Sequence, residues 1–138
     1  MPMANMIILD SSFIISYYNL EDQNHEKALE LMTKISRGIY GEVIISDYIF
    51  DETVTVLLAK LKDLGRVKII GDKMMRALKY HIDEETFKDT WQLFNVQKQT
   101  KLSFTDCSII ALMKNRNINN IATFDEEFKK IKELSIIQ

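Results

Sequence analysis

The 138-residue sequence has little cysteine, proline or glycine, and each shortage excludes a class of protein. A single cysteine, Cys107, cannot form an internal disulfide and has no second thiol for a zinc site, which is typical of a reducing compartment. With one proline and four glycines the chain has no Pro/Gly-rich linker, so we expect one domain over residues 1–138. The proportions of hydrophobic (46%) and charged (28%) residues exclude disordered and fibrous classes.

Long hydrophobic runs and an excess of basic residues are also absent. The apolar runs at residues 7–9 and 43–45 are far shorter than the ~20 residues that cross a bilayer. No basic segment precedes the first of these runs, so we expect no secretory signal, no membrane association and a cytoplasmic location. Because the formal net charge is −2, any interaction with nucleic acid would depend on local groups or on metal.

Short apolar segments that predict strands alternate along the chain with segments that predict helices. Parallel strands require crossover connections, and helical crossovers cover both faces of the sheet. We therefore expect an α/β fold, a three-layer α/β/α sandwich with a central parallel sheet of four to five strands. The predicted strands are residues 6–9, 43–46, 78–82 (the weakest), 120–123 and 135–137. The predicted helices are residues 24–37, a helix that ends near residue 64, residues 66–77, a helix that begins after Asp83, and residues 103–116 and 126–132. Gly65 is the expected C-cap of the helix that ends near residue 64, and Asp83 is the expected N-cap of the helix that follows it.

Two acidic residues follow predicted strands. In open parallel sheets, ligands bind beyond the carboxyl ends of the strands, where the winding direction reverses. Asp10 comes directly after the first strand and Asp125 comes shortly after the fourth. The hydroxyls and amides of Ser11 and Ser12 beside Asp10 suit a metal-bound water or a phosphate oxygen. Either acid could instead be only the N-cap of the helix that follows it.

Two further acidic residues lie in predicted helices. Asp106 shares a helical stripe with Ile109, Ile110 and Met113, so it points along the packed face and needs a cation or metal as a partner. It also stands three residues after Ser103, the spacing of a capping box. Glu52 lies near the start of a predicted helix and has apolar residues on two sides of it. It could instead be an acid on a solvated face of that helix.

Several carboxylates and few soft ligands favour a hard divalent cation, Mg²⁺ or Mn²⁺, over zinc. The two histidines, His25 and His81, are far apart in sequence and have no ligand-like spacing. We expect each of them to be a surface or strand residue rather than a catalytic one.

The whole chain resembles the PIN-domain family, and especially its toxin ribonucleases of VapC type. The resemblance is carried in order by Ile7-Ile-Leu-Asp10-Ser-Ser, Ser46-Asp-Tyr-Ile-Phe-Asp-Glu52, Leu102-Ser-Phe-Thr-Asp106-Cys-Ser-Ile-Ile-Ala-Leu and Ile121-Ala-Thr-Phe-Asp125-Glu-Glu-Phe128. It implies that the acidic catalytic and metal-binding cluster is Asp10, Glu52, Asp106 and Asp125, supported by the hydroxyls of Ser12 and Thr123. No acid of that pattern is missing.

By the same resemblance, the carboxylates hold one or two Mg²⁺ or Mn²⁺ ions and the protein hydrolyses RNA phosphodiester bonds. We expect an endoribonuclease toxin that is inhibited by an antitoxin covering the acidic crevice. A non-catalytic module that binds RNA or protein, and a structure-specific nuclease acting in RNA maturation or on DNA, are the alternatives. The resemblance also implies a homodimer, for which the helix at residues 50–64 with Met74, Met75 and Leu78 supplies apolar surface, although core packing explains these residues equally well.

Overall fold

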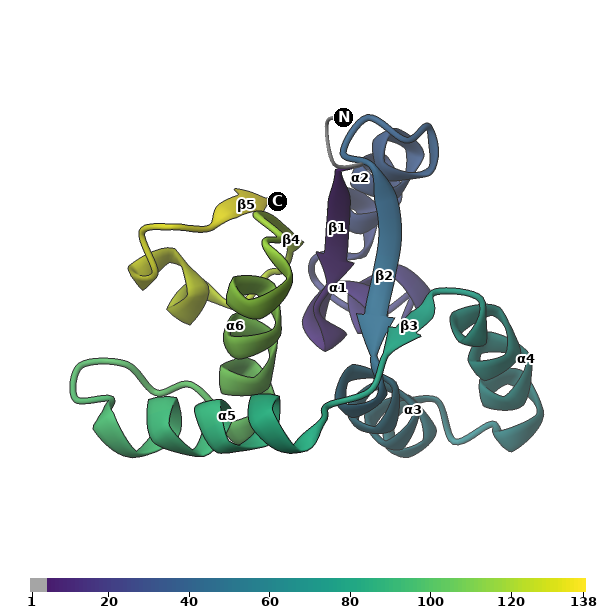
Figure 1. Ribbon diagram of the computed structural model, residues 1–138. Helices are drawn as coiled ribbons and strands as arrows, with labels where there is room; N and C mark the ends of the chain where they lie inside the picture. Colours follow the sequence, from purple (N-terminus) through teal and green to yellow (C-terminus); the bar gives the residue numbers. More distant parts are fainter. Residues whose placement is uncertain (1–4) are drawn as a thin grey trace.

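The computed structural model describes residues 5–138, which form a five-stranded parallel sheet flanked by helices (Figure 1). The predicted three-layer α/β/α sandwich is confirmed, with five strands. In chain order the elements are β1 (Met6–Leu9), α1 (Ser11–Tyr18), α2 (His25–Ser36), β2 (Glu42–Ser46), α3 (Asp47–Leu61), α4 (Leu64–Met75), β3 (Leu78–Tyr80), α5 (Glu84–Val96), α6 (Phe104–Arg116), β4 (Asn120–Ala122), the 3-10 helix η1 (Glu126–Lys130) and β5 (Ser135–Ile137).

The sheet reverses its winding direction between β1 and β4. The strand order is β3-β2-β1-β4-β5, so the chain first winds from β1 to β2 and β3, then returns to β4 and β5 on the other side of β1. Because crossovers between parallel strands are right-handed, α1 to α4 and the pair α5 and α6 cover opposite faces. The carboxyl ends of β1 and β4 therefore form the switch point, the place where such sheets bind ligands.

The central strands are almost wholly apolar because both of their faces are covered. Ile7, Ile8, Ile44 and Ile121 are fully buried, and burial of each such side chain contributes roughly 1.5–3 kcal/mol. Strand β1 pairs with β2 on one side and with β4 on the other, where Leu9 lies opposite Ala122. This register brings the residues that follow β1 and β4 side by side.

Gly41 fixes the approach of the chain to β2. It has a φ of +94°, and a Cβ at this position would lie 2.1 Å from the carbonyl oxygen of Asn5. That carbonyl accepts a hydrogen bond from the Glu42 N–H at 3.0 Å, just before the β1–β2 ladder begins. Only glycine combines this φ with such a close backbone contact, so Gly41 sets the start of the strand pairing.

Gly65 does not end a helix as predicted. Helix α3 ends at Leu61, and its C-cap is Lys62 in the left-handed conformation (φ 53°). Asp63 then accepts a hydrogen bond from the Arg66 N–H and caps α4, so Gly65 lies in the first turn of that helix. The side-chain cap offered by Asp63 satisfies a free backbone donor, which the glycine could not do.

The remaining differences concern the lengths and types of elements. The predicted helical turn after Asp10 extends to Tyr18, β3 stops at Tyr80, and residues 126–130 form a 3-10 helix where an α-helix was expected. Within residues 5–138 no helix combines the length and apolar character needed to cross a membrane.

Candidate functional site

Asp10 lies at the carboxyl end of β1, at the switch point of the sheet. Its backbone N–H donates to the Ala122 carbonyl at 3.0 Å, which continues the contact between β1 and β4. Asp10 occupies the N-cap position of α1, but its side chain makes no capping hydrogen bond. The interpretation of this carboxylate as only a helix cap is therefore wrong, and the side chain, 1% exposed, has other partners.

Two hydroxyls hold the Asp10 carboxylate. Ser12 Oγ and Thr123 Oγ1 each donate to Asp10 Oδ2 at 2.7 Å. The same hydroxyl oxygens accept the backbone N–H groups of Phe124 and Asp125, respectively, at 3.0 Å. Because each hydroxyl oxygen already accepts from an amide, its own proton is available to the carboxylate. The residues that follow β1 and β4 are thus joined through the Asp10 carboxylate.

The other oxygen of this carboxylate, Asp10 Oδ1, is buried and has no hydrogen-bond partner among the described residues. Burial raises the pKa of Asp10, whereas the Thr123 and Ser12 hydroxyls lower it and the negative charges of Glu52 and Asp125 raise it. A buried carboxylate oxygen without a donor favours either a proton or a nearby cation.

Asp106 is both a helix cap and a buried acid. Its backbone N–H donates to Ser103 Oγ, and its Oδ2 accepts from the Ser103 N–H, both at 3.0 Å, which forms the predicted capping box. Burial raises the pKa of Asp106 to about 7; the Ser103 amide opposes this, and the charges of Asp10 and Asp125 add to it. The side chain is also buried, which agrees with the expectation that Asp106 points along the packed face of its helix.

Glu52 reaches the site from α3. Its side chain is half-buried and accepts a hydrogen bond from the Ser11 hydroxyl of α1, so it does not lie on a freely solvated face. This contact joins residues 41 positions apart, and nothing in the local sequence indicates it. Ser11 is therefore a site residue whose part sequence reasoning missed, although it lies in the predicted Ser11-Ser12 pair.

Asp125 is the N-cap of η1, which is the alternative role that its position before a predicted helix indicated. Its Oδ1 accepts the N–H of Glu127 at 2.9 Å. Its charge acts on the pKa values of both Asp10 and Asp106, so this residue is both a helix cap and part of the acidic group, the name used below for Asp10, Glu52, Asp106 and Asp125.

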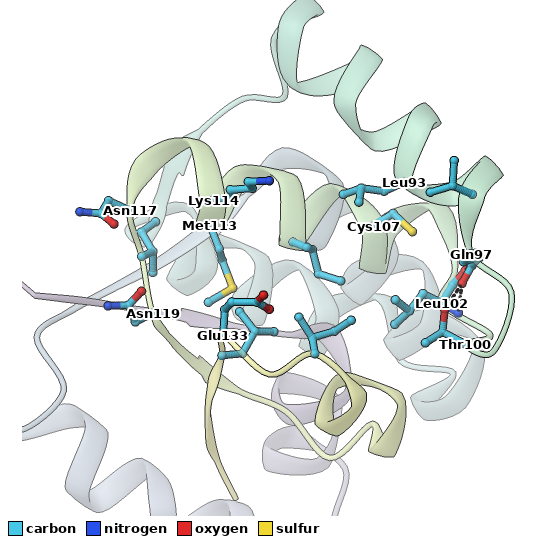
Figure 2. Close-up of a pocket in the computed structure, with 15 residues that line it drawn as sticks. Leu93, Gln97, Thr100, Leu102, Cys107, Met113, Lys114, Asn117, Asn119 and Glu133 are labelled. Atoms are coloured by element: carbon cyan, nitrogen blue, oxygen red, sulfur yellow. Dashed lines mark hydrogen bonds between the residues drawn. The ribbon is translucent and has the colours of Figure 1, made fainter.

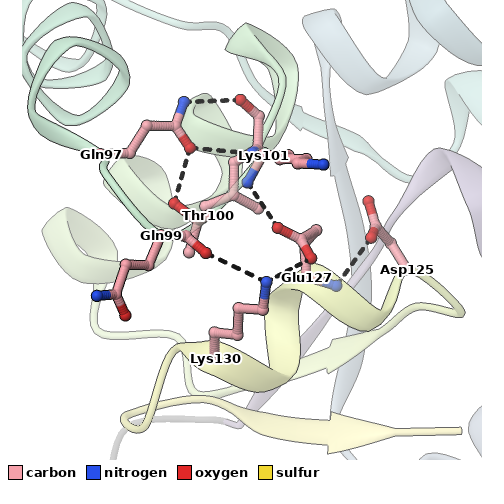
Figure 3. A network of polar contacts seen from close by, with 8 residues as sticks. Gln97, Gln99, Thr100, Lys101, Asp125, Glu127 and Lys130 are labelled. Carbon is pink, nitrogen blue, oxygen red and sulfur yellow. Dashed lines mark hydrogen bonds and ion pairs between the residues drawn. The ribbon is translucent and has the colours of Figure 1, made fainter.

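The loop before α6 is tied to η1 (Figure 3). Gln97 Oε1 accepts from the Leu102 N–H and the Thr100 hydroxyl, and Gln97 Nε2 donates to the Leu102 carbonyl. Glu127 accepts from the Lys101 N–H, and Lys130 pairs with Glu127 at 2.8 Å. The segment leading to Asp106 is thereby anchored to the helix that Asp125 begins.

The acidic group fits a hard divalent cation in its chemistry. Within residues 5–138, no three Asp, Glu, His or Cys side chains converge as a complete set of metal ligands. Mg²⁺ is commonly held by one or two carboxylates and keeps several waters, and it suits a buried oxygen such as Asp10 Oδ1 that has no hydrogen-bond donor in the part of the chain that the structure describes.

A separate cavity of about 520 Å³ lies between α5, α6 and the C-terminal segment (Figure 2). None of the four acids lines it, and its walls are chiefly apolar, including Leu93, Met113 and Cys107. Burial raises the pKa of the Cys107 thiol to about 11, so the thiol stays protonated near neutral pH. This cavity offers neither a metal ligand set nor a nucleophile.

The two histidines have structural contacts. His25 begins α2, is buried, and its Nδ1 lies 2.8 Å from the Ser16 carbonyl oxygen, so the expectation of a surface or strand position is wrong for it. His81 is exposed, and its Nδ1 lies 3.3 Å from Asp47 Oδ2. Neither belongs to the acidic group.

The parallel sheet matches the architecture expected from the alternation of strands and helices. Around its switch point, the charges of Glu52 and Asp125 act on the pKa of Asp10, and those of Asp10 and Asp125 act on the pKa of Asp106. Residues 7–134 match the PIN domain, and the chain belongs to this family.

Relatives in this family include the 23S rRNA-specific endonuclease VapC20 of Mycobacterium tuberculosis, which is 23% identical over 124 residues, 89% of this chain and 92% of the relative. The VapC ribonuclease of Archaeoglobus fulgidus is 22% identical over 107 residues, and that match covers 72% of this chain and 64% of the relative.

Solved structures share the fold. The crystal structure of Mycobacterium tuberculosis VapC20, described as a Sarcin-Ricin loop cleaving toxin, has a TM-score of 0.78 at 22% identity and covers 90% of this chain and 93% of that one. The VapBC2 structure from Rickettsia felis, bound to a DNA fragment from its promoter, has a TM-score of 0.67 at 18% identity and covers 96% and 97%.

Proposed function

We propose that this chain is a Mg²⁺- or Mn²⁺-dependent endoribonuclease, the toxin of a toxin–antitoxin pair. The observation that supports it most is Asp10 Oδ1 at the switch point, which is buried and has no hydrogen-bond partner within residues 5–138; the charges of Glu52 and Asp125 also raise the pKa of Asp10. The relatives named VapC ribonuclease and 23S rRNA-specific endonuclease support RNA as the substrate.

Each residue of the acidic group has a proposed role. Asp10 and Asp106 would bind the cation directly, Asp125 directly or through water, and Glu52 would bind it or orient the attacking water. The bound cation supplies neutralisation of the scissile phosphate and lowers the pKa of water. Ser12 and Thr123 hold Asp10 in one orientation through Oδ2, so Oδ1, which has no partner among the described residues, would face the cation.

The same geometry explains why substrate binding would require metal. Four carboxylates repel the negatively charged phosphodiester until a cation offsets their charge. Ser11 restrains Glu52 by donating to it, so this carboxylate is kept beside α1 and the end of β1.

Cleavage assays test the proposal. With Mn²⁺ the purified chain is expected to cleave RNA, with loss of activity in EDTA and a decrease of about 100-fold or more in Asp10→Asn. Asp72→Asn, which removes an exposed acid of α4 outside the group, is the matched control and should keep full activity. Cleavage that survives both EDTA and Asp10→Asn would contradict the proposal, and preference for tRNA or flapped DNA over single-stranded RNA would favour the structure-specific alternative.

Two protein partners are part of the proposal. An antitoxin segment would cover the acidic crevice, and a structure described as a toxin-antitoxin complex from Klebsiella pneumoniae, with a TM-score of 0.64, supports a partner of this kind. A second copy of the chain is the other partner. Leu58, Ile69 and Met75 are exposed apolar residues on α3 and α4 that a homodimer would cover, whereas Met74 belongs to the core.

A non-catalytic binding module would be expected to have lost at least one acid of the group. All four are present; Asp10 and Asp106 are buried, as is the supporting Thr123, while Ser12 is half-buried. No specific feature of the described residues favours that alternative.

A further inference from the structure

An aromatic hollow of about 480 Å³ opens beside Glu52, between α3, α5 and the start of α6. It is lined by aromatic rings together with carboxylates and hydroxyls, among them Tyr48, Asp51, Glu52, Thr55, Phe87 and Phe104. The α3 members are spaced three and four residues apart, so they form one stripe of that helix. Glu52 therefore belongs to both the acidic group and the hollow.

The rings of the hollow are available for stacking. Phe104 lies at its centre, with ring centroids 6.2 Å from Tyr48 and 5.3 Å from Phe87. Phe87 is 47% exposed, although a Phe side chain loses roughly 1.5–3 kcal/mol of burial free energy by remaining in water. Exposed aromatic faces beside a polar rim are typical of a binding surface.

The charges of the hollow disfavour a phosphate and favour a nucleobase. Its lining includes the carboxylates of Asp51 and Glu52 and no Lys or Arg. A phosphate is repelled here, whereas a nucleobase is uncharged and carries N–H donors that carboxylates and the Thr55 hydroxyl can accept. Unpaired RNA bases are recognised by stacking on aromatic side chains together with hydrogen bonds to their edges.

We propose that the aromatic hollow binds an unpaired nucleobase of the RNA substrate next to the scissile phosphate. The inference rests on the proposed ribonuclease function and specifies its substrate class, RNA with an unstacked base beside the cleavage site. Glu52 joins the two regions, so a base in the hollow places its own phosphate toward the acidic group. A base inside a regular duplex is stacked and paired, and cannot enter the hollow.

Phe87→Ala is the test variant and Trp91→Ala its matched control, because Trp91 is an equally exposed aromatic residue of α5 that does not line the hollow. Phe87→Ala is expected to reduce kcat/KM on single-stranded RNA with Mn²⁺ by roughly 5- to 150-fold, the range for loss of one stacked base, while Trp91→Ala has little effect. Wild-type protein should also cleave an RNA with an abasic nucleotide at that position more slowly. Thermal unfolding of both variants checks that they are folded.

A binding measurement separates this inference from the proposed activity. With Mn²⁺ and an intact acidic group, a single-stranded RNA that carries 2-aminopurine and a non-hydrolysable linkage at the cleavage position should change fluorescence on stacking, and Phe87→Ala should remove that change. If the wild type cleaves no RNA but the Phe87-dependent fluorescence change is present, the ribonuclease proposal fails and the base site stands. Equal kcat/KM values for wild type and Phe87→Ala would overturn the base site. It would also be overturned if both α5 variants lost the mass of a dimer in sedimentation, because this face would then be an interface between two copies of the chain.

Discussion

Two buried carboxylates, Asp10 and Asp106, make the centre of the molecule sensitive to pH. Burial raises the pKa of both, and each also feels the charge of another acid of the group. Asp106 keeps its capping hydrogen bonds while its pKa rises to about 7, so its local structural role does not offset the cost of ionisation. A residue can therefore serve as a helix cap while burial makes its side chain costly to ionise.

We expect the metal-free protein to lose stability as pH rises from about 4 to about 7. Over this range the folded state holds the proton of Asp106, whose pKa is about 7, while the unfolded chain, with a pKa near 3.8, has released it. The difference is on the order of 2–4 kcal/mol after discounting for solvent access. Urea unfolding in EDTA across this range measures it, and Asp106→Asn should flatten the profile. Parallel profiles for the two proteins would contradict the expectation.

At the scale of elements, hydrogen bonds of the loop of residues 97–102 link the helix of Asp106 to the helix that Asp125 caps. Gln97 closes the loop through three hydrogen bonds, and Glu127 and Lys130 attach it to η1 (Figure 3). Asp106 begins its helix after this loop, and Asp125 caps η1. The relative placement of the two acids therefore depends on contacts outside the acidic group itself.

Gln97→Ala is expected to loosen this loop. Loss of its hydrogen bonds should lower the free energy of unfolding by about 1–3 kcal/mol and increase hydrogen exchange at the Leu102 amide. Under the proposed function, RNA cleavage should also fall, because Phe104 of the aromatic hollow and Asp106 of the acidic group both lie in the first turn of α6, directly after this loop. Gln99→Ala is the control, since Gln99 takes part only through its backbone carbonyl. Identical exchange in the two variants would show that Gln97 does not anchor the loop.

At the scale of the whole molecule, the acidic group joins segments from both faces of the sheet. Asp10 and Thr123 follow the adjacent strands β1 and β4, Glu52 comes from α3 on one face, and Asp106 from α6 on the other. A cation bound among them would cross-link these elements in the folded state alone. Metal binding should therefore be visible as global stability.

We expect Mn²⁺ to raise the Tm of the wild-type protein by several degrees at pH 7.5. A ligand at 100 times its Kd stabilises the folded state by about 2.7 kcal/mol. Asp10→Asn should lose this response, while the control Asp72→Asn keeps it; differential scanning fluorimetry measures all three. An equal rise in wild type and Asp10→Asn would place the metal elsewhere.

The strands and the positions of Asp10 and Asp125 after them could be predicted because they depend on local pattern. Apolar runs such as residues 6–9 must be covered on both faces, and an acid that interrupts such a run marks its end. The cap of α6 was equally local, since Ser103 and Asp106 are three residues apart. The end of α3 was missed because Lys62 adopts a left-handed conformation that its residue type does not favour.

By itself, the sequence determined the fold class, because this follows from short-range periodicity, and it predicted the four acids from a resemblance carried by short segments. Only the tertiary structure decided that Thr123 and Ser12 share one oxygen of Asp10, that Ser11 holds Glu52, and that Phe87 and Phe104 meet beside it. Except for the local Ser12–Asp10 bond, these contacts join residues 17 to 113 positions apart, and their geometry depends on strand order and helix packing that no local pattern specifies.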